Sequence, residues 1–198
     1  MKIQNSERVS PKWVNGYHRN RQLGDLKAFD IKNVLESLEN LTASTNLYVD
    51  GIGIVPLRDD FKGEGSISLD FSNAQKFKKV ELGLNNLTSL NVSGLTTLER
   101  LLCVGTQLTS LNVGGLTALR ELYCRHNQLT SLNVNDCTVL RSLDCSHNQL
   151  STTVLNEVFN SLPDYGMPGV CFGRAYFGNN PGTGSCNRSI LWEKGWCE

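Results

Sequence analysis

The sequence has no long hydrophobic run and no excess of charge of either sign. Its 198 residues include 19 Lys and Arg against 19 Asp and Glu, so the formal net charge is zero. No apolar stretch reaches the roughly 20 residues that a membrane-spanning helix requires. Proteins that bind nucleic acid usually carry a basic excess. We therefore expect no nucleic-acid partner and no membrane span, and the length favours one domain.

Motifs of enzymes and of secretion are also missing. The chain contains no G-x-S-x-G, H-E-x-x-H, G-x-x-x-x-G-K-[ST] or C-x-x-C pattern, which would indicate nucleophilic, zinc, phosphate or redox chemistry. Residues 1–20 lack the apolar segment of a secretory signal, which leaves a cytoplasmic location open. We expect a protein without catalytic activity and without a cofactor.

What the sequence does contain is a repeat of fixed length. The stretch from Leu87 to Leu150 divides into blocks of 21 residues: LTSLNVSGLTTLERLLCVGTQ, LTSLNVGGLTALRELYCRHNQ and LTSLNVNDCTVLRSLDCSHNQ. The second half of each block, together with the Leu that follows the block, has the leucine-rich pattern L-x-x-L-x-C-x-x-N-x-L. The pattern covers 98–108, 119–129 and 140–150, and in the first of these Thr106 stands in place of Asn. Residues 66–86 form a degenerate fourth copy. One turn cannot bury its apolar residues alone, so the turns must stack around a shared core.

The spacing predicts a short parallel strand in every turn, joined by extended return arms that carry further apolar columns. The strands are expected at 80–82, 101–103, 122–124 and 143–145. The arm columns are Leu69, Leu90, Leu111 and Leu132, and Phe71, Val92, Val113 and Val134. A third column, of Asn85, Asn127 and Asn148, should satisfy the backbone of the tight turns. Thr106 has only one hydroxyl, so we expect a weaker turn there.

The period and the Cys at the third apolar place resemble the cysteine-ladder leucine-rich repeats of internalin J-like bacterial surface proteins. The segment NNPGTGSCNRSILWEKGW at 179–196 is similar to the end of leucine-rich-repeat proteins from gut Bacteroidetes. The resemblance implies an α/β solenoid, a bacterial source, a cell-surface or secreted location, and a role in binding another protein. Because many functions share one fold, it implies the fold more firmly than the partner.

The two ends of the chain depart from the repeat. Residues 1–65 are expected to form an N-terminal capping region, with a helix from Asp30 to about Glu39 and a hairpin or edge strand at 47–55. Residues 150–198 are expected to form a helix–strand–helix cap. Its first helix ends before Pro163, its strand covers 170–177, and Ser185 caps a helix that reaches Lys194. Both caps would cover the exposed ends of the repeats at 66–149, giving one structural domain.

The chain has seven cysteines, an odd number. Cys103, Cys124 and Cys145 recur every 21 residues at an inward position, so we expect buried free thiols, which pack as small hydrophobic groups. Cys137 stands where the preceding blocks have Leu and should also be buried. The other three are Cys171, Cys186 and Cys197. A disulfide among these three would require an oxidising compartment.

The candidate binding residues are the outward residues of the predicted strands. They vary from turn to turn, while the core columns hardly change. Alternation along each strand places them on one surface, which we call the concave face. They are Lys79 and Glu81; Arg100, Leu102 and Val104; Glu121, Tyr123 and Arg125; Ser142, Asp144 and Ser146. Leu102, Val104 and Tyr123 form an apolar centre within a charged rim, a composition typical of protein interfaces.

Several functions remain open at this point. The first is a monomeric module that binds another protein through the concave face and the adjacent caps. The second is an inhibitor or immunity-type protein that occludes a toxin or enzyme. The third is an enzyme with its site in the ends, around His18, Arg174, Tyr176 and Cys186, and the fourth is a structural spacer without a ligand. His126 and His147 share one column, but two ligands alone make a weak metal motif, so we expect no metal.

Overall fold

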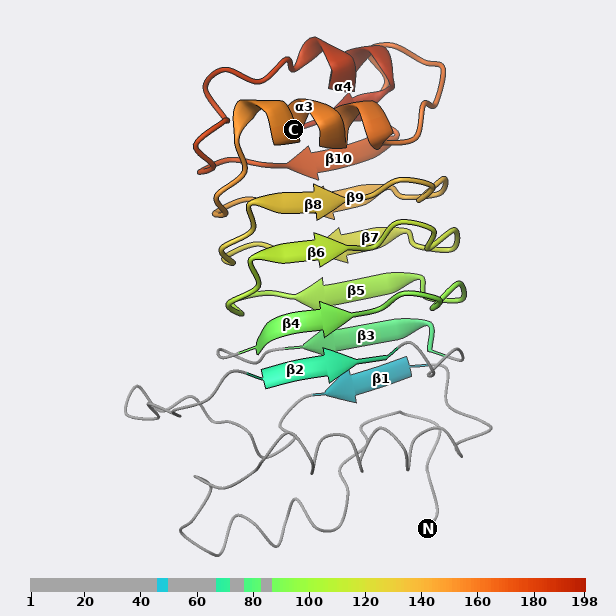
Figure 1. Ribbon diagram of the computed structural model, residues 1–198. Helices are drawn as coiled ribbons and strands as arrows, with labels where there is room; N and C mark the ends of the chain where they lie inside the picture. The colour runs from blue at the N-terminus through green and yellow to red at the C-terminus, as the bar shows by residue number, and fades with distance from the viewer. Residues whose placement is uncertain (1–45, 50–66, 72–76, 83–86) are drawn as a thin grey trace, which may run out of the picture.

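The computed structural model describes residues 46–49, 67–71, 77–82 and 87–198. Its main element is a seven-stranded parallel sheet in the order β1-β3-β5-β7-β9-β10-β11, with one strand from each of the four predicted repeats at β3, β5, β7 and β9 (Figure 1). The strands are β1 (Asn46–Val49), β3 (Lys79–Leu82), β5 (Arg100–Cys103), β7 (Glu121–Tyr123), β9 (Ser142–Asp144), β10 (Gly173–Tyr176) and β11 (Trp196–Cys197). The four repeat strands therefore lie where the spacing predicts them, shifted by about one residue.

The return arms form a second layer in front of this sheet in Figure 1. They contain two parallel pairs, β2 (Ile67–Asp70) with β4 (Leu87–Asn91) and β6 (Ser110–Asn112) with β8 (Ser131–Asn133). The arms are thus more regular than the irregular extended segments that the sequence predicts. Leu111 pairs with Leu132 in register, which aligns one column of the core across turns.

The core lies between these two layers and consists of the columns that the repeat predicts. The inner sheet places Val80, Leu101, Leu122 and Leu143 in register, and each of these side chains is fully buried. The arms contribute Leu90, Leu111, Leu132, Val92, Val113 and Val134 from the opposite side, all of them buried. Stacked parallel strands around shared apolar columns define a solenoid of the leucine-rich-repeat type.

The three ladder cysteines are free, fully buried thiols, as predicted. Burial raises the pKa of Cys103 and of Cys145 to about 12, and it raises the pKa of Cys124 well above its ordinary value. A thiol in such surroundings stays protonated and is a poor nucleophile. Cys137 is also buried, and its Sγ lies 3.2 Å from the carbonyl oxygen of Val113. These residues therefore serve packing.

The asparagine column forms a ladder of buried amides between turns. Asn148 Nδ2 donates to the carbonyls of Cys124 and Cys145, each at 3.0 Å, while its Oδ1 accepts from Leu129 N at 3.0 Å. Asn127 bonds one turn earlier in the same way. Each amide thus joins two turns through backbone groups that apolar neighbours would leave without partners. Asn85, the remaining predicted member, lies outside the described residues.

Thr106 occupies its place in this column differently. It is buried, and its hydroxyl donates to Asn127 Oδ1. Asn127 Nδ2 reaches the carbonyl of Cys103, at 2.7 Å, which belongs to the turn of Thr106. The neighbouring amide therefore supplies a bond to this turn, and whether the turn is weaker stays a prediction.

The ladder continues one step beyond the predicted repeats. Asn180 Nδ2 donates to the carbonyls of Cys145 and Phe177, at 3.0 and 2.8 Å, and its Oδ1 accepts from Leu150 N at 3.0 Å. On β10, Ala175 is in register with Leu143 of β9. The segment from β10 to Asn180 therefore completes another turn of the solenoid. The sequence predicts only a strand in this segment and not a further repeat.

Two helices accompany this last turn. Helix α3 (Thr152–Ser161) begins after Ser151, whose Oγ accepts from Val154 N at 3.3 Å, and it ends before Pro163, as expected. It stands above β8, in the place of the next arm (Figure 1). Helix α4 (Ser189–Glu193) is shorter than predicted, because its N-cap is Arg188 and not Ser185, which lies in a preceding turn.

The C-terminal segment after α4 differs from the expectation. Residues 196–197 form β11, which pairs with β10, where the sequence predicts only the end of a helix. Cys171 and Cys197 form a disulfide, with their Cα atoms 5.4 Å apart, while Cys186 remains free. The disulfide joins the segment before β10 to β11. The capping role and the boundaries at 65 and 149 remain predictions.

Part of the N-terminal prediction falls outside the described residues, including the helix from Asp30 and most of the segment 47–55. Within that segment, β1 is a strand at the edge of the sheet and pairs with β3, in agreement with an edge strand. Among the residues described, none of the helices has the length and apolar character to cross a bilayer.

Candidate functional site

The outward residues of neighbouring strands lie side by side on one surface of the sheet. The register aligns them in two columns across β3, β5, β7, β9 and β10. One column contains Lys79, Arg100, Glu121, Ser142 and Arg174, and the other contains Glu81, Leu102, Tyr123, Asp144 and Tyr176. Except for Asp144 at the end of β9, these residues are more accessible than their neighbours along each strand, so the columns face away from the core.

The charged residues at the β3–β7 end are paired with one another. Lys79 Nζ lies 2.8 Å from Glu81 Oε1, and Arg100 Nη1 lies 3.2 Å from Glu121 Oε2. Arg100 Nε is 3.9 Å from Glu81 Oε1, so the four side chains form a chain of alternating charge. The Glu121 Oε2 and Arg100 Nε atoms are covered but make no hydrogen bond. Such partly exposed pairs add little stability, and their main effect is to orient the side chains.

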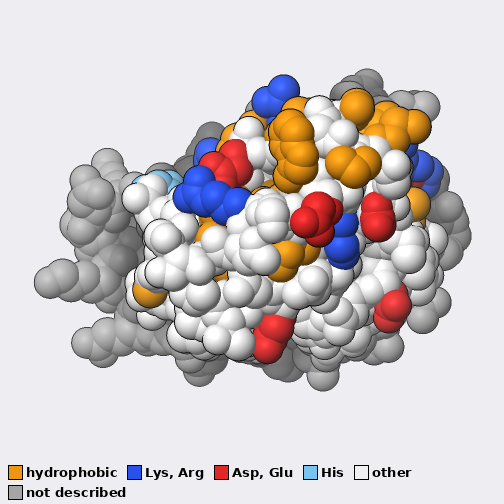
Figure 2. Space-filling model, turned by 90° about the horizontal axis from the view of Figure 1, so that it is seen from above, with side chains coloured by type: hydrophobic (Ala, Val, Ile, Leu, Met, Phe, Trp, Pro, Cys, Tyr) orange, Lys and Arg blue, Asp and Glu red, His pale blue; other side chains and the backbone are white. Residues whose placement is uncertain are grey.

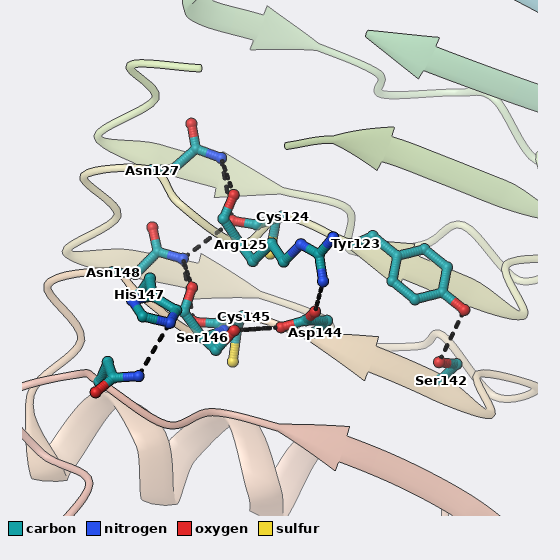
Figure 3. Close-up of polar contacts among 11 residues, drawn as sticks. Tyr123, Cys124, Arg125, Asn127, Ser142, Asp144, Cys145, Ser146, His147 and Asn148 are labelled. Atoms are coloured by element: carbon teal, nitrogen blue, oxygen red, sulfur yellow. Dashed lines mark hydrogen bonds and ion pairs between the residues drawn. The ribbon is translucent and has the colours of Figure 1, made fainter. Parts of the chain in front are cut away.

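Tyr123 is held at the centre of this surface from two sides. The guanidinium of Arg100 lies 5.4 Å from the ring centroid, within the range of a cation–π contact. Ser142 Oγ donates to Tyr123 Oη at 3.2 Å (Figure 3). Leu102 of β5 pairs in register with Tyr123 of β7, and Val104 comes directly after β5. All three side chains are half-buried. These three apolar side chains are therefore partly open to solvent on this surface.

Asp144 departs from the prediction of an accessible contact group. Its side chain is buried, with Oδ1 accepting from Ser146 Oγ at 2.6 Å and from Ser146 N at 3.2 Å (Figure 3). Its Oδ2 lies 3.4 Å from Arg125 Nη1. The carboxylate is thus satisfied within the protein and orders the turn after β9. Of this trio, only Arg125 is widely exposed.

Strand β10 adds two residues that were not predicted for this face. Arg174 and Tyr176 are exposed on β10 beside Ser142 and Asp144, and Arg174 Nη1 donates to Tyr176 Oη at 3.4 Å. From the sequence, both residues are candidates only for an enzyme site, together with Cys186 and His18. Cys186 instead packs against the hydrophobic core, with its Sγ 3.4 Å from the carbonyl oxygen of Thr183. His18 lies outside the described residues.

The two histidines, His126 and His147, lie on successive turns, each shortly after a strand of the sheet. Their rings stack with centroids 4.2 Å apart and 18° between planes, and His147 Nε2 is 3.0 Å from Asn179 Nδ2. Stacked parallel rings do not direct their nitrogen lone pairs at a common point. In the described part of the chain, no group of three or more His, Cys, Asp or Glu could hold a metal ion.

The backbone explains why histidine occurs there. His126, His147 and Asn179 have φ values of 56°, 53° and 58°, in the left-handed region. Asn and His are among the non-glycine residues found there most often. The first block has Gly105 at this place, with φ 68°, which is the sequence signal for a left-handed turn.

Large exposed hydrophobic side chains gather beside β10. Met167, Val170, Phe172 and Trp192, which we call the C-terminal apolar rim, are each 46–58% exposed. Figure 2 shows hydrophobic groups on one side of this end of the molecule, while the opposite side shows mostly backbone and side chains that are neither hydrophobic nor charged. Gly169 permits the rim to form, because a Cβ there would approach Trp192 Cζ2 to 2.8 Å. Contiguous exposed apolar surface often indicates an interaction site.

Comparisons with known proteins agree with this description of the fold. A solved structure, the functional domain of InlJ from Listeria monocytogenes, which includes a cysteine ladder, is similar to this chain with a TM-score of 0.52 and 26% sequence identity. The similarity covers 67% of this chain and 27% of the InlJ chain, so it spans about a quarter of that chain. No protein-family model and no curated protein matches the sequence. The findings support an internalin-like leucine-rich-repeat fold.

Proposed function

We propose that this chain is a non-catalytic module that binds another protein through the concave face. The observation that supports this most is Tyr123, half-exposed at the centre of the sheet and fixed by Arg100 and Ser142. A rigid aromatic side chain loses little conformational entropy on binding, and Tyr and Arg are common interface hot spots. The InlJ-like fold favours the same class of function.

The proposed contact surface includes β10 and the C-terminal apolar rim. Neighbouring strands are about 4.8 Å apart, so the strands from β3 to β9 alone span only about 15 Å. A standard interface needs roughly 800 Å² from each partner. Tyr176 and Arg174 lengthen the face by one strand, and Phe172 alternates with them on the same side of the chain. Together they extend the face toward the rim.

The charges of the face indicate what the partner would carry. Most carboxylates of the face are already paired with Arg or Lys, whereas Arg174 bonds only to a tyrosine hydroxyl among the described residues. A partner with a carboxylate near an apolar segment would complement this end. The resemblance favours a bacterial surface or host-interaction role, and the alternative is an inhibitor or immunity-type protein that occludes a toxin or enzyme through the same surface.

The experiment begins by capturing partners from the lysate and envelope fractions of the source organism and identifying them by mass spectrometry. Binding of the purified partner is then measured for Tyr123→Ala and for Thr109→Ala, an exposed control on the return arm. We expect Tyr123→Ala to weaken binding by about 1–3 kcal/mol, because it removes a central anchor. Thr109→Ala should change binding by less than about 0.5 kcal/mol.

Melting curves of the two variants serve as the control for folding. Tyr123 is only half-buried, so its loss should leave the cooperative transition in place. Equal affinity of Tyr123→Ala and the unsubstituted protein would contradict the concave face as the contact surface. Loss of binding only on substitution of the ends would move the site to the caps.

A further inference from the structure

A groove lies on the layer of the return arms, on the other side of the molecule from the concave face. It has a volume of about 630 Å³ and lies between the outer side of β6 and β8 and helix α3. Figure 1 shows α3 standing above β8 in the column of arm strands. A helix is wider than the extended arm whose place it takes, so it does not continue the flat outer surface of the arms. The volume is within the range of small-ligand sites.

The lining of this outer groove includes a row of ordered amides. Asn112 Oδ1 accepts from Gly114 N and from Asn133 Nδ2, both at 2.9 Å, and Asn133 Oδ1 accepts from Asn135 N at 2.9 Å. Gly114 makes room for this arrangement, because a Cβ there would lie 2.7 Å from Asn133 Nδ2. The amides are therefore oriented by the repeat itself before any ligand arrives.

Polar groups remain for a ligand after these bonds are made. No hydrogen bond among the described residues uses the Nδ2 groups of Asn112 and Asn135 or the hydroxyls of Ser110 and Ser131. All four residues line the groove and are exposed. A hydroxyl donates and accepts, and a free amide N–H donates. Such groups are suited to a ligand that carries several hydroxyls.

The charges narrow the class of ligand. Glu157 is the only charged residue in the lining, and no Lys or Arg takes part. Sites for phosphate and carboxylate ligands rely on Arg or Lys, so an anion is disfavoured here. Val154, on α3, provides an apolar contact for the carbon face of a ring. We propose that the outer groove binds a neutral carbohydrate, independently of the protein-binding function proposed for the concave face.

The test uses the full chain against a panel of neutral and anionic oligosaccharides, with titration calorimetry on those that bind. Ser131→Trp places a large side chain in the groove, and Ser89→Trp is its matched control, two turns away in the same arm column and outside the groove. We expect a neutral oligosaccharide to bind saturably, Ser131→Trp to weaken it more than tenfold, and Ser89→Trp to change it less than twofold. Tyr123→Ala should leave this binding unchanged.

Three results would overturn the inference: no binding by the unsubstituted chain, binding of anionic oligosaccharides alone, or equal affinity of the Ser131→Trp and Ser89→Trp variants. Circular dichroism verifies folding of both variants. If Ser131→Trp does not fold, Ser110→Trp takes its place, because Ser110 is exposed in the same groove. Because Tyr123 is not in the groove, failure here is distinguishable from failure of the concave-face proposal.

Discussion

A chain that ends at Gln149 is expected to lose its cooperative fold and to aggregate. The deletion removes β10, whose Arg174 N donates to the carbonyl of Arg141, and it leaves Cys145 N and His147 N without their acceptors, Tyr176 O and Gly178 O. It also uncovers the columns of the last predicted repeat. An unpaired strand edge beside exposed apolar columns is a template for association.

Point variants within residues 150–198 test whether the packing of this segment stabilises the repeats, without removing any of the chain. Phe159 is fully buried and meets Phe177 edge to face, with centroids 4.9 Å apart, so Phe159→Ala should cost about 3–5 kcal/mol. Phe172→Ala is the matched control, because that ring is 46% exposed. A soluble, monomeric 1–149 fragment that melts cooperatively in calorimetry would show instead that residues 150–198 are an appendage.

The second large effect is expected for Asn148→Ala in the amide ladder. Asn148 is 1% exposed, and its loss leaves Leu129 N without a partner. It also removes one hydrogen bond from each of the carbonyls of Cys124 and Cys145, which keep their bonds from Asn127 and Asn180. The unpaired Leu129 N costs about 1–3 kcal/mol and each of the two lost carbonyl bonds about 1 kcal/mol, so we expect a total of about 3–5 kcal/mol. The measurement is the free energy of unfolding in urea.

An exposed asparagine provides the control for this variant. Asn160 lies on α3 and makes one side-chain bond, from Nδ2 to the carbonyl of Asn156 at 2.9 Å. Asn160→Ala should therefore change the free energy of unfolding by less than about 0.5 kcal/mol. Similar values for the two variants would mean that the ladder does not hold the turns together.

The repeat itself accounts for what could be predicted from the sequence. A strict period of 21 residues fixes which side chains share a column, so the buried places of Leu101, Leu122 and Cys124 follow without a structure. The same alternation identifies Tyr123 as an outward residue. These predictions succeed because each turn repeats the environment of the previous one.

The predictions are least accurate where the period breaks. Asn148 and Asn180 are 32 positions apart in the chain, because α3 and the segment after it intervene. The spacing therefore conceals the last turn, and with it the places of Arg174 and Tyr176. The burial of Asp144 was also missed, because it depends on Arg125 and Ser146 closing over the carboxylate. Alternation along a strand predicts which way a side chain points, but not whether other side chains cover it.

The Cys171–Cys197 pairing illustrates a different limit. The sequence left three candidate cysteines, and no periodicity relates them. Their proximity depends on β11 pairing with β10, which only the three-dimensional arrangement shows. The pairing in the structure also leaves Cys186 free, against the core. Local sequence carries no signal for such a contact.

The most direct test of the central claim, binding through the concave face, is hydroxyl-radical footprinting of the complex with the captured partner. The face offers reactive aromatic probes in Tyr123 and Tyr176, and the rim offers Trp192, all accessible in the free chain. The account predicts that the partner slows oxidation of both tyrosines severalfold, while Val154 on α3 keeps its rate. Unchanged oxidation of Tyr123 and Tyr176, with protection confined to α3 or the return arms, would contradict it.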